Sequence, residues 1–177
     1  MVRNLIVVVA AVLVLGGCST TKHRYAPTLY GMDPSALAAL NRLSVQRPIA
    51  VINAQQKDTQ VLLGAKGVNE LHGSLKDLTE TIVMNANREL TKRSIGTNPG
   101  SPTALNVRVT AAGSDSTLLN VEATLEIEVV TGSGMTKNIK VTNKTPGSVP
   151  RAFNGAASLA VIEIFSDPQI LAYLSAP

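Results

Sequence analysis

Residues 121–143 read VEATLEIEVVTGSGMTKNIKVTN, and this stretch gives the clearest indication of the fold. Apolar and polar side chains alternate on both sides of the segment 132–134, as in strands that have one buried and one wet face. The segment itself, Gly-Ser-Gly, predicts a three-residue hairpin loop with Gly134 in the left-handed conformation. Thr131 and Met135 would then close the loop as a cross-strand pair, so we expect an antiparallel hairpin.

Both faces of the two strands specify the register of this hairpin. A slip by one residue would set Leu125 against Lys140. The same alternation over 105–111 predicts another strand upstream, and the three strands together would form an antiparallel meander. The pairs expected within the hairpin are Ile127–Ile139, Leu125–Val141, Glu126–Lys140 and Glu122–Lys144, and those expected with the upstream strand are Val107–Ala123 and Arg108–Glu122.

Other segments predict further strands and one long helix. Short apolar runs bounded by breakers predict strands at 49–52 and 61–63. Apolar residues at three- and four-residue steps predict an amphipathic helix over 74–94. Ser74 is the expected N-cap of this helix, and Gly96 is the expected left-handed residue just past its end.

Two helices are expected after the meander, and they complete the fold class. Pro146-Gly147 and Pro150 break the chain, and the apolar spacing over 155–165 predicts a helix. Asp167 followed by Pro168 predicts the start of a last short helix, with Asp167 as its N-cap. We therefore expect the α+β class, with an antiparallel or mixed sheet of about four to five strands and two helices packed on one face.

The start of the chain has the pattern of a bacterial lipoprotein signal peptide. Arg3 precedes an apolar run at 5–15, which is too short for a membrane-spanning helix of roughly 20 residues. The run ends before Cys18, the only cysteine of the chain. We expect cleavage before Cys18, an S-diacylglycerol on its thiol and an N-palmitoyl group on the new amino terminus. The expected recognition residues for cleavage are Leu15, Gly16 and Gly17.

This pattern divides the chain into three expected parts and predicts its location in the cell. The parts are a signal peptide at 1–17, a flexible acylated tether at 18–47 and a periplasmic domain at 48–177. Polar residues and prolines dominate the expected tether, which favours an extended linker. Position 19 is Ser, whereas Asp after the cysteine would favour retention at the inner membrane. We therefore expect a lipid-anchored protein on the periplasmic face of the outer membrane.

Composition excludes several function classes. The chain has no Trp, two Phe and three Tyr, so its core must be aliphatic and it lacks platforms on which bases or sugars stack. With its single cysteine lipidated, it would have no disulfide and no cysteine metal site. The formal net charge of +4 is mild and typical of solvated faces. We expect no nucleic-acid partner, since no recognition motif is present, and no cofactor.

No group of residues in the sequence has the spacing of a catalytic or metal site. His23 and His72 are isolated, so hydrogen bonding or solvation is expected for both rather than metal ligation. Glu122, Glu126 and Glu128 alternate on one strand face, as a pair of acid–base carboxylates could, but their lysine-facing register favours ion pairs. Nucleophile-elbow and phosphate-loop patterns are absent from the sequence. We therefore expect a protein that is not an enzyme.

Four segments carry a resemblance to a known family: Leu15–Cys18, Leu90–Arg93, Gly134–Asn138 and Asp167–Leu174. In these segments the chain resembles the YajG-type family of small bacterial outer-membrane lipoproteins. The order of strand, helix, three-strand meander and helix is also similar to that of auxiliary lipoproteins of ABC-type lipid transport systems. Neither resemblance implies a catalytic residue.

Two function classes stay open on the sequence. The first is a non-catalytic lipoprotein, held in the membrane by its acyl anchor, that acts as a binding or accessory module. Its expected partner is an envelope protein, peptidoglycan or a lipid. An accessory role in an ABC-type lipid or envelope transport system is a narrower form of this hypothesis and rests on architecture alone. The second class is a periplasmic enzyme, which predicts a pocket with convergent polar groups and a perturbed pKa.

Overall fold

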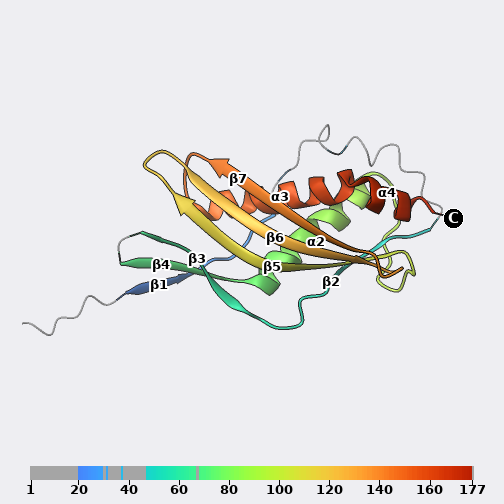
Figure 1. Ribbon diagram of the computed structural model, residues 1–177, viewed down its shortest axis with the longest axis horizontal. Coiled ribbons are helices and arrows are strands. Elements are labelled where there is room, and N and C mark those ends of the chain that lie inside the picture. The colour runs from blue at the N-terminus through green and yellow to red at the C-terminus, as the bar shows by residue number, and fades with distance from the viewer. Residues whose placement is uncertain (1–19, 30, 32–36, 38–46, 67, 177) are drawn as a thin grey trace, which may run out of the picture.

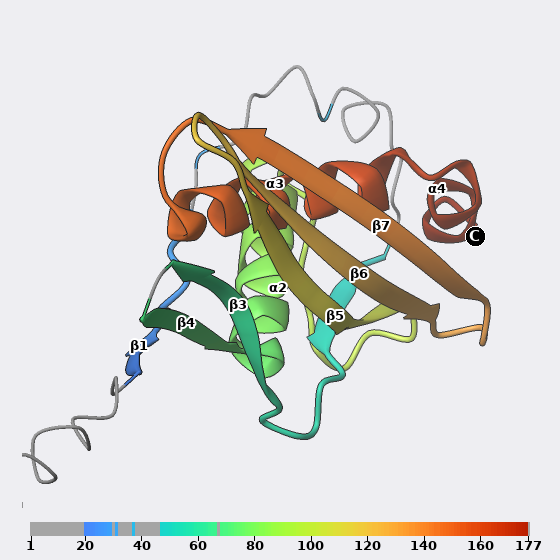
Figure 2. The same ribbon diagram turned by 60° about the vertical axis from the view of Figure 1, so that its left-hand side comes forward.

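The structure is a computed structural model, and it describes residues 20–29, 31, 37, 47–66 and 68–176. The described strands form two sheets, one in the order β1-β4-β3 and one in the order β2-β5-β6-β7. Helices α2 and α3 cover one face of the four-stranded sheet (Figure 1), and the three-stranded sheet lies beside it (Figure 2). The fold is the predicted α+β class, with two mixed sheets in place of one.

The bounds of several elements differ from the predicted ones, in both halves of the chain. Strand β4 was not predicted, because its sequence NELHGS contains no β-branched side chain and does not alternate. The strands are β1 Thr21–Arg24, β2 Ala50–Asn53, β3 Gln60–Lys66, β4 Asn69–Ser74, β5 Ala104–Ser116, β6 Val121–Thr131 and β7 Thr136–Thr145. The helices are α2 Leu75–Lys92, α3 Val149–Ser166 and α4 Pro168–Leu174.

The β6–β7 hairpin has the predicted register. The Thr131 N–H donates to the Met135 carbonyl at 2.9 Å, and Gly134 has a φ of +88°. A left-handed residue at this position closes the three-residue loop without splaying the strands. The observed pairs include Ile127–Ile139, Leu125–Val141, Glu126–Lys140 and Glu122–Lys144.

The predicted register between β5 and β6 is wrong. Val107 pairs with Val129, and Arg108 pairs with Glu128. Strand β5 continues to Ser116, although residues 112–116 are small or polar and favour a loop by composition. A bulge between Val109 and Ala111 shifts the register further. The long partner strand β6 keeps these residues paired, so tertiary pairing outweighs local preference.

Helix α2 begins as predicted and ends differently. The Ser74 hydroxyl accepts the Asp77 N–H at 3.1 Å, which confirms Ser74 as the N-cap. Past the end of the helix, Ser94 rather than Gly96 takes the left-handed conformation, with a φ of +58°. The adjacent Ile95 N–H donates to the Leu90 carbonyl at 3.0 Å and closes the helix end.

The two C-terminal helices follow the meander directly. Helix α3 begins at Val149 and not at the predicted Gly155, because Pro150 lies in its first turn, where a missing N–H breaks no helical bond. Helix α4 has the predicted cap: Asp167 Oδ1 accepts the N–H groups of Gln169 and Ile170 at 2.8 and 3.0 Å.

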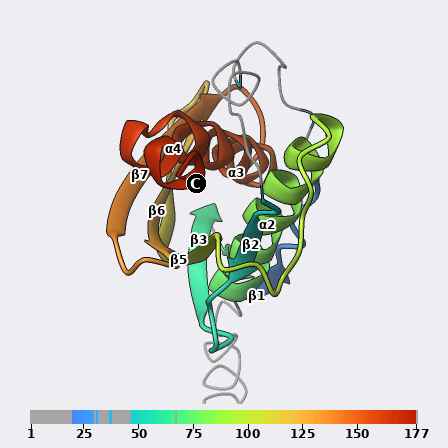
Figure 3. The same ribbon diagram turned by 90° about the vertical axis from the view of Figure 1, so that its right-hand side faces the viewer.

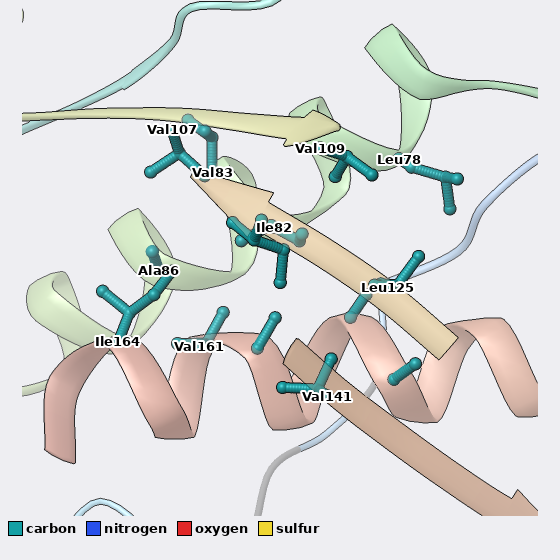
Figure 4. Packing of buried hydrophobic residues seen from close by; sticks show 14 of the residues in the cluster. Leu78, Ile82, Val83, Ala86, Val107, Val109, Leu125, Val141, Val161 and Ile164 are labelled. Atoms are coloured by element: carbon teal, nitrogen blue, oxygen red, sulfur yellow. The ribbon is translucent and has the colours of Figure 1, made fainter. Parts of the chain in front are cut away.

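The main core lies between the four-stranded sheet and the two long helices. Helix α3 packs on β6 and β7, whereas α2 packs on β2 and β5 (Figure 3). The core is aliphatic apart from a few aromatic rings, as the composition predicts. Buried residues that meet across these layers include Leu78, Ile82, Val83, Ala86, Val107, Val109, Leu125, Val141, Val161 and Ile164 (Figure 4).

Candidate functional site

The predicted lipidation site lies at the start of the chain, outside the described residues. Leu15, Gly16, Gly17, Cys18 and Ser19 all precede Thr20, where the description begins. The structure does describe residues 20–29, which would join a lipid on the cysteine to the domain. The contacts of this segment therefore decide how a membrane anchor would hold the protein.

Strand β1 begins three residues after Cys18 and belongs to the smaller sheet. It pairs in parallel with β4. The Thr21 N–H donates to the Val68 carbonyl at 2.9 Å, and the Tyr25 N–H donates to the His72 carbonyl at 2.7 Å. All four side chains of β1 are exposed, so backbone hydrogen bonds are the main attachment of this strand to the domain. Two long side-chain contacts add to them, His23 to Asn69 and Arg24 to Asp77, at 3.4 Å each.

Tyr25 attaches the same segment to helix α3. Its ring is buried and lies 6.0 Å from the ring of Phe153, centroid to centroid. The Tyr25 hydroxyl donates to Asn154 Oδ1, which also accepts the Thr28 N–H at 3.2 Å. Asn154 Nδ2 returns a hydrogen bond to Thr28 Oγ1 at 2.8 Å. Burial raises the pKa of the Tyr25 hydroxyl above its ordinary value, so it remains a protonated donor.

The described part of the expected tether is therefore attached to the domain. Residues 21–25 are hydrogen-bonded to β4, Tyr25 is 3% exposed and Leu37 is 1% exposed. The composition of residues 18–47 does not predict this contact, because polar residues and prolines outnumber the few side chains that pack on the domain. The available signal was Tyr25 itself, since an aromatic ring in a polar segment usually finds a burial site. No sequence pattern identifies Asn154 as the hydrogen-bond partner of Tyr25.

The outer face of the four-stranded sheet holds a shallow, open hollow. Its volume is about 430 Å³, and it is lined by residues 111–115, Thr124, Glu126 and Lys140. Lys140 Nζ on β7 lies 3.2 Å from Glu126 Oε1 on β6, so these two charged side chains neutralise each other. This arrangement can offer a polar surface to a partner, and its lining contains no histidine or cysteine nucleophile.

The three alternating carboxylates of β6 have cations as neighbours. Glu126 pairs with Lys140, and Glu128 Oε1 lies 2.8 Å from Arg108 Nε. Glu122 is opposite Lys144 in the strand register. These neighbours agree with the ion-pair interpretation rather than with an acid–base pair.

The two histidines lie in the smaller sheet and have separate partners. His23 Nε2 is 3.4 Å from Asn69 Oδ1, and His72 Nε2 is 2.8 Å from Glu70 Oε2. Within the described part of the chain, no group of three His, Cys, Asp or Glu residues could hold a metal ion.

One buried charge was not singled out from the sequence. The Glu89 side chain on α2 is 3% exposed, and it accepts hydrogen bonds from Lys92 and Arg93 at 2.7 and 2.8 Å. Burial opposes its ionisation, but these two cations outweigh burial and hold the pKa of Glu89 below its ordinary value. The i, i+3 and i, i+4 spacing was the available signal. The cluster lies in the last turns of α2 and stabilises this end of the helix.

No individual helix among the described residues has the length and apolar content needed to cross a membrane. Helices α3 and α4 meet this test only as a pair, bent by 65° between them, and by length and composition alone.

Comparison with known proteins supports the fold and names no activity. No family model and no curated protein matches the chain. Among solved structures, the fold is similar to that of a Xanthomonas campestris protein of the family DUF330, with a TM-score of 0.51 and 14% sequence identity. The likeness covers 86% of this chain and 96% of that chain. The resemblance to YajG-type lipoproteins stays a prediction.

Proposed function

We propose that this protein is a non-catalytic, lipid-anchored lipoprotein that acts as a binding or accessory module on the periplasmic face of the outer membrane. The observation that carries the proposal is the Leu15–Cys18 pattern placed directly before a folded strand. Acyl chains on Cys18 would anchor the protein, because each buried methylene contributes about 0.8 kcal/mol.

The docked β1 supports a specific mode of anchoring. Three residue steps separate Cys18 from Thr21, and an extended chain spans at most about 11 Å over three residues. A lipid on Cys18 would therefore hold the domain against the bilayer. A long stalk that lets the domain reach far from the membrane is not what this geometry favours.

Metabolic labelling tests the anchor. The full-length chain and its Cys18→Ala variant are expressed in a Gram-negative cell that is fed an alkynyl fatty acid. We expect label and membrane fractionation only with Cys18 present, and an uncleaved precursor when the lipoprotein signal peptidase is inhibited. Equal membrane fractionation of the two variants without label would contradict the proposal.

The sorting residue supplies a matched control. Ser19→Asp leaves the acylated cysteine in place, so we expect full labelling with a shift from the outer to the inner membrane fraction. An unchanged outer-membrane location would argue against the assigned role of Ser19 while leaving the anchor intact.

An accessory role in an ABC-type lipid or envelope transport system is the second candidate. The exposed, polar outer face of the four-stranded sheet favours it, because a surface with neutralised charges can meet a protein partner. Crosslinking in cells followed by mass spectrometry, with Cys18→Ala as the control, tests this candidate. Capture of a transporter subunit that depends on Cys18 would support it. Capture of peptidoglycan-associated proteins alone would favour a cell-wall partner.

A further inference from the structure

The turn between β5 and β6 presents two adjacent leucines to solvent. Leu118 is fully exposed, and Leu119 is 79% exposed. The Thr117 N–H donates to the Asn120 carbonyl at 2.8 Å, and the Asn120 N–H donates to Thr117 Oγ1 at 3.1 Å, so the turn is closed by its own polar groups. Central turn positions usually carry Gly, Asn, Asp or Ser. The two leucines are outside the hydrophobic core, so packing gives no reason for them.

A third exposed apolar side chain, Val68, lies at the turn between β3 and β4. It is 49% exposed. Strands β3 and β5 contact each other where Ser114 Oγ donates to the Leu63 carbonyl at 2.6 Å. Both strands then run towards the same end of the long axis, where β5 leads to the turn with Leu118 and β3 to the turn with Val68 (Figure 1). The strands diverge on the way, so the two turns are separate points at this end (Figure 2). We call Leu118, Leu119 and Val68 the apolar tip.

The start of β1 lies at the same end of the molecule as the apolar tip. The Thr21 N–H bonds directly to the Val68 carbonyl. The C-terminus and the β6–β7 turn lie at the opposite end (Figure 1). Because Cys18 is within about 11 Å of Thr21 by chain length, a lipid on this cysteine would bring this end of the domain to the membrane.

We propose that the apolar tip inserts into the acyl-chain region of the same membrane leaflet that holds the lipid on Cys18. This inference rests on the proposed lipid anchor. The anchor and the β5–β6 turn would then be separate points of attachment, and together they would fix the orientation of the domain on the bilayer. Burial of each exposed leucine in hydrocarbon increases partitioning by about tenfold or more.

The charges next to the turn limit the depth of insertion. Asp115 and Glu122 are paired across β5 and β6, below the two leucines. Carboxylates are excluded from hydrocarbon, so only the turn itself can enter. Lys144 lies opposite Glu122 on the next strand, so the charges beside the turn have no cationic excess. We therefore expect insertion to depend on apolar burial rather than on attraction to anionic lipids. A bilayer is favoured over a second copy of this chain, since the anchor delivers this end of the molecule to lipid.

A single tryptophan can report the contact, because the chain contains none. Leu118→Trp is introduced into the full-length lipoprotein, which is purified from membranes and reconstituted into phosphatidylcholine vesicles with brominated acyl chains. The matched control is Ser133→Trp, in the exposed turn at the other end of β6. We expect blue-shifted emission from Trp at position 118 and quenching at least threefold stronger than at position 133, both insensitive to salt.

The outcomes separate this inference from the anchor. If the protein floats with the vesicles but both tryptophans are quenched equally weakly, the anchor stands and the inference is wrong. If the emission at position 118 is blue-shifted without quenching, and crosslinked dimers form, the tip contacts a second copy instead. If the protein does not float with vesicles, the proposed anchor itself fails. A reporter at the edge of the turn tests the leucines themselves. Thr117→Trp should be quenched when both leucines are present, and this quenching should be lost when Leu118→Asn and Leu119→Gly are added.

Discussion

The two sheets of this protein are stabilised in different ways. In the four-stranded sheet, every second residue of β6 from Val121 to Thr131 is buried, and this face packs on α3. In the three-stranded sheet, all of β1 is exposed, and Leu63 is the one fully buried residue of β3. The larger sheet is thus a hydrophobic layer, whereas the smaller one depends on backbone pairing, on the buried Leu63 and on the Tyr25 contacts.

This difference explains why the larger sheet could be predicted and the smaller could not. Alternation buries one face of a strand, so the same pattern that stabilises β6 also reveals it in the sequence. Strands β1 and β4 lack the pattern, because neither has a continuous buried face. Their positions follow from contacts between distant residues, among them Tyr25 and Asn154.

A matched pair of core truncations tests whether the two sheets are stabilised differently. Leu125 and Leu63 are each 0% exposed, one in each sheet. We expect Leu125→Ala to lower the free energy of global unfolding by about 2–5 kcal/mol, measured by urea denaturation. Leu63→Ala should instead speed hydrogen exchange in β1, β3 and β4, with a smaller change in the denaturation midpoint. Equal midpoint shifts would mean that the two sheets unfold as one unit.

Removing the Tyr25 hydroxyl tests how much this side chain contributes to the attachment of residues 20–29. Tyr25→Phe keeps the ring against Phe153 but removes the donor to Asn154, so we expect docking of residues 20–29 to weaken by about 1–2 kcal/mol. Amide hydrogen exchange of these residues measures the loss.

The same tyrosine predicts a pH dependence of docking. Because burial raises its pKa in the folded state, the protonated hydroxyl contributes stability that is complete below the unfolded pKa of about 10 and is lost as pH rises beyond it. Exchange in the wild-type segment should therefore accelerate at alkaline pH beyond the intrinsic rate, and this excess should vanish in Tyr25→Phe. An equal excess in both proteins would show that another group titrates.

The N-cap of α4 is the next feature that can be tested by substitution. Asp167→Ala removes the acceptor for two N–H groups and should cost about 0.5–2 kcal/mol. Burial opposes ionisation of Asp167, but hydrogen bonds from Ile170, Lys137 and Gln169 outweigh it and hold its pKa below the ordinary value. Its charge therefore contributes stability above about pH 4, which is lost as pH falls through the lowered pKa. Thermal unfolding of Asp167→Asn, which keeps an acceptor, should show a weaker acid dependence than wild type.

The exposed pair on the outer face should have the smallest effect. Lys140 and Glu126 have side chains that are 66% and 49% exposed, so water screens their attraction. We expect Lys140→Gln to change stability by about 0.2–1 kcal/mol at low salt, and by less at high salt. A larger, salt-independent loss in denaturation would show that this face contributes more than surface pairing.

The candidate site was only partly predictable. The Leu15–Cys18 pattern is local and can be recognised without a fold, whereas the apolar tip required the structure. Leu118 and Leu119 do not resemble turn residues, and the predicted β5–β6 register was wrong partly because the chain reverses at this unusual turn. Only the structure shows that both leucines are exposed and lie at the same end of the molecule as the start of β1 (Figure 1).

By itself, the sequence determined the β6–β7 hairpin, the N-caps at Ser74 and Asp167, and the aliphatic core. Each of these depends on residues close together in the chain or on composition, so short-range physics suffices. The tertiary structure alone decided the β5–β6 register, the existence of β4 and the docking of residues 20–29. These features depend on pairing and burial between segments far apart in the chain, such as Tyr25 against Asn154, where the partner's position exists only once the protein has folded.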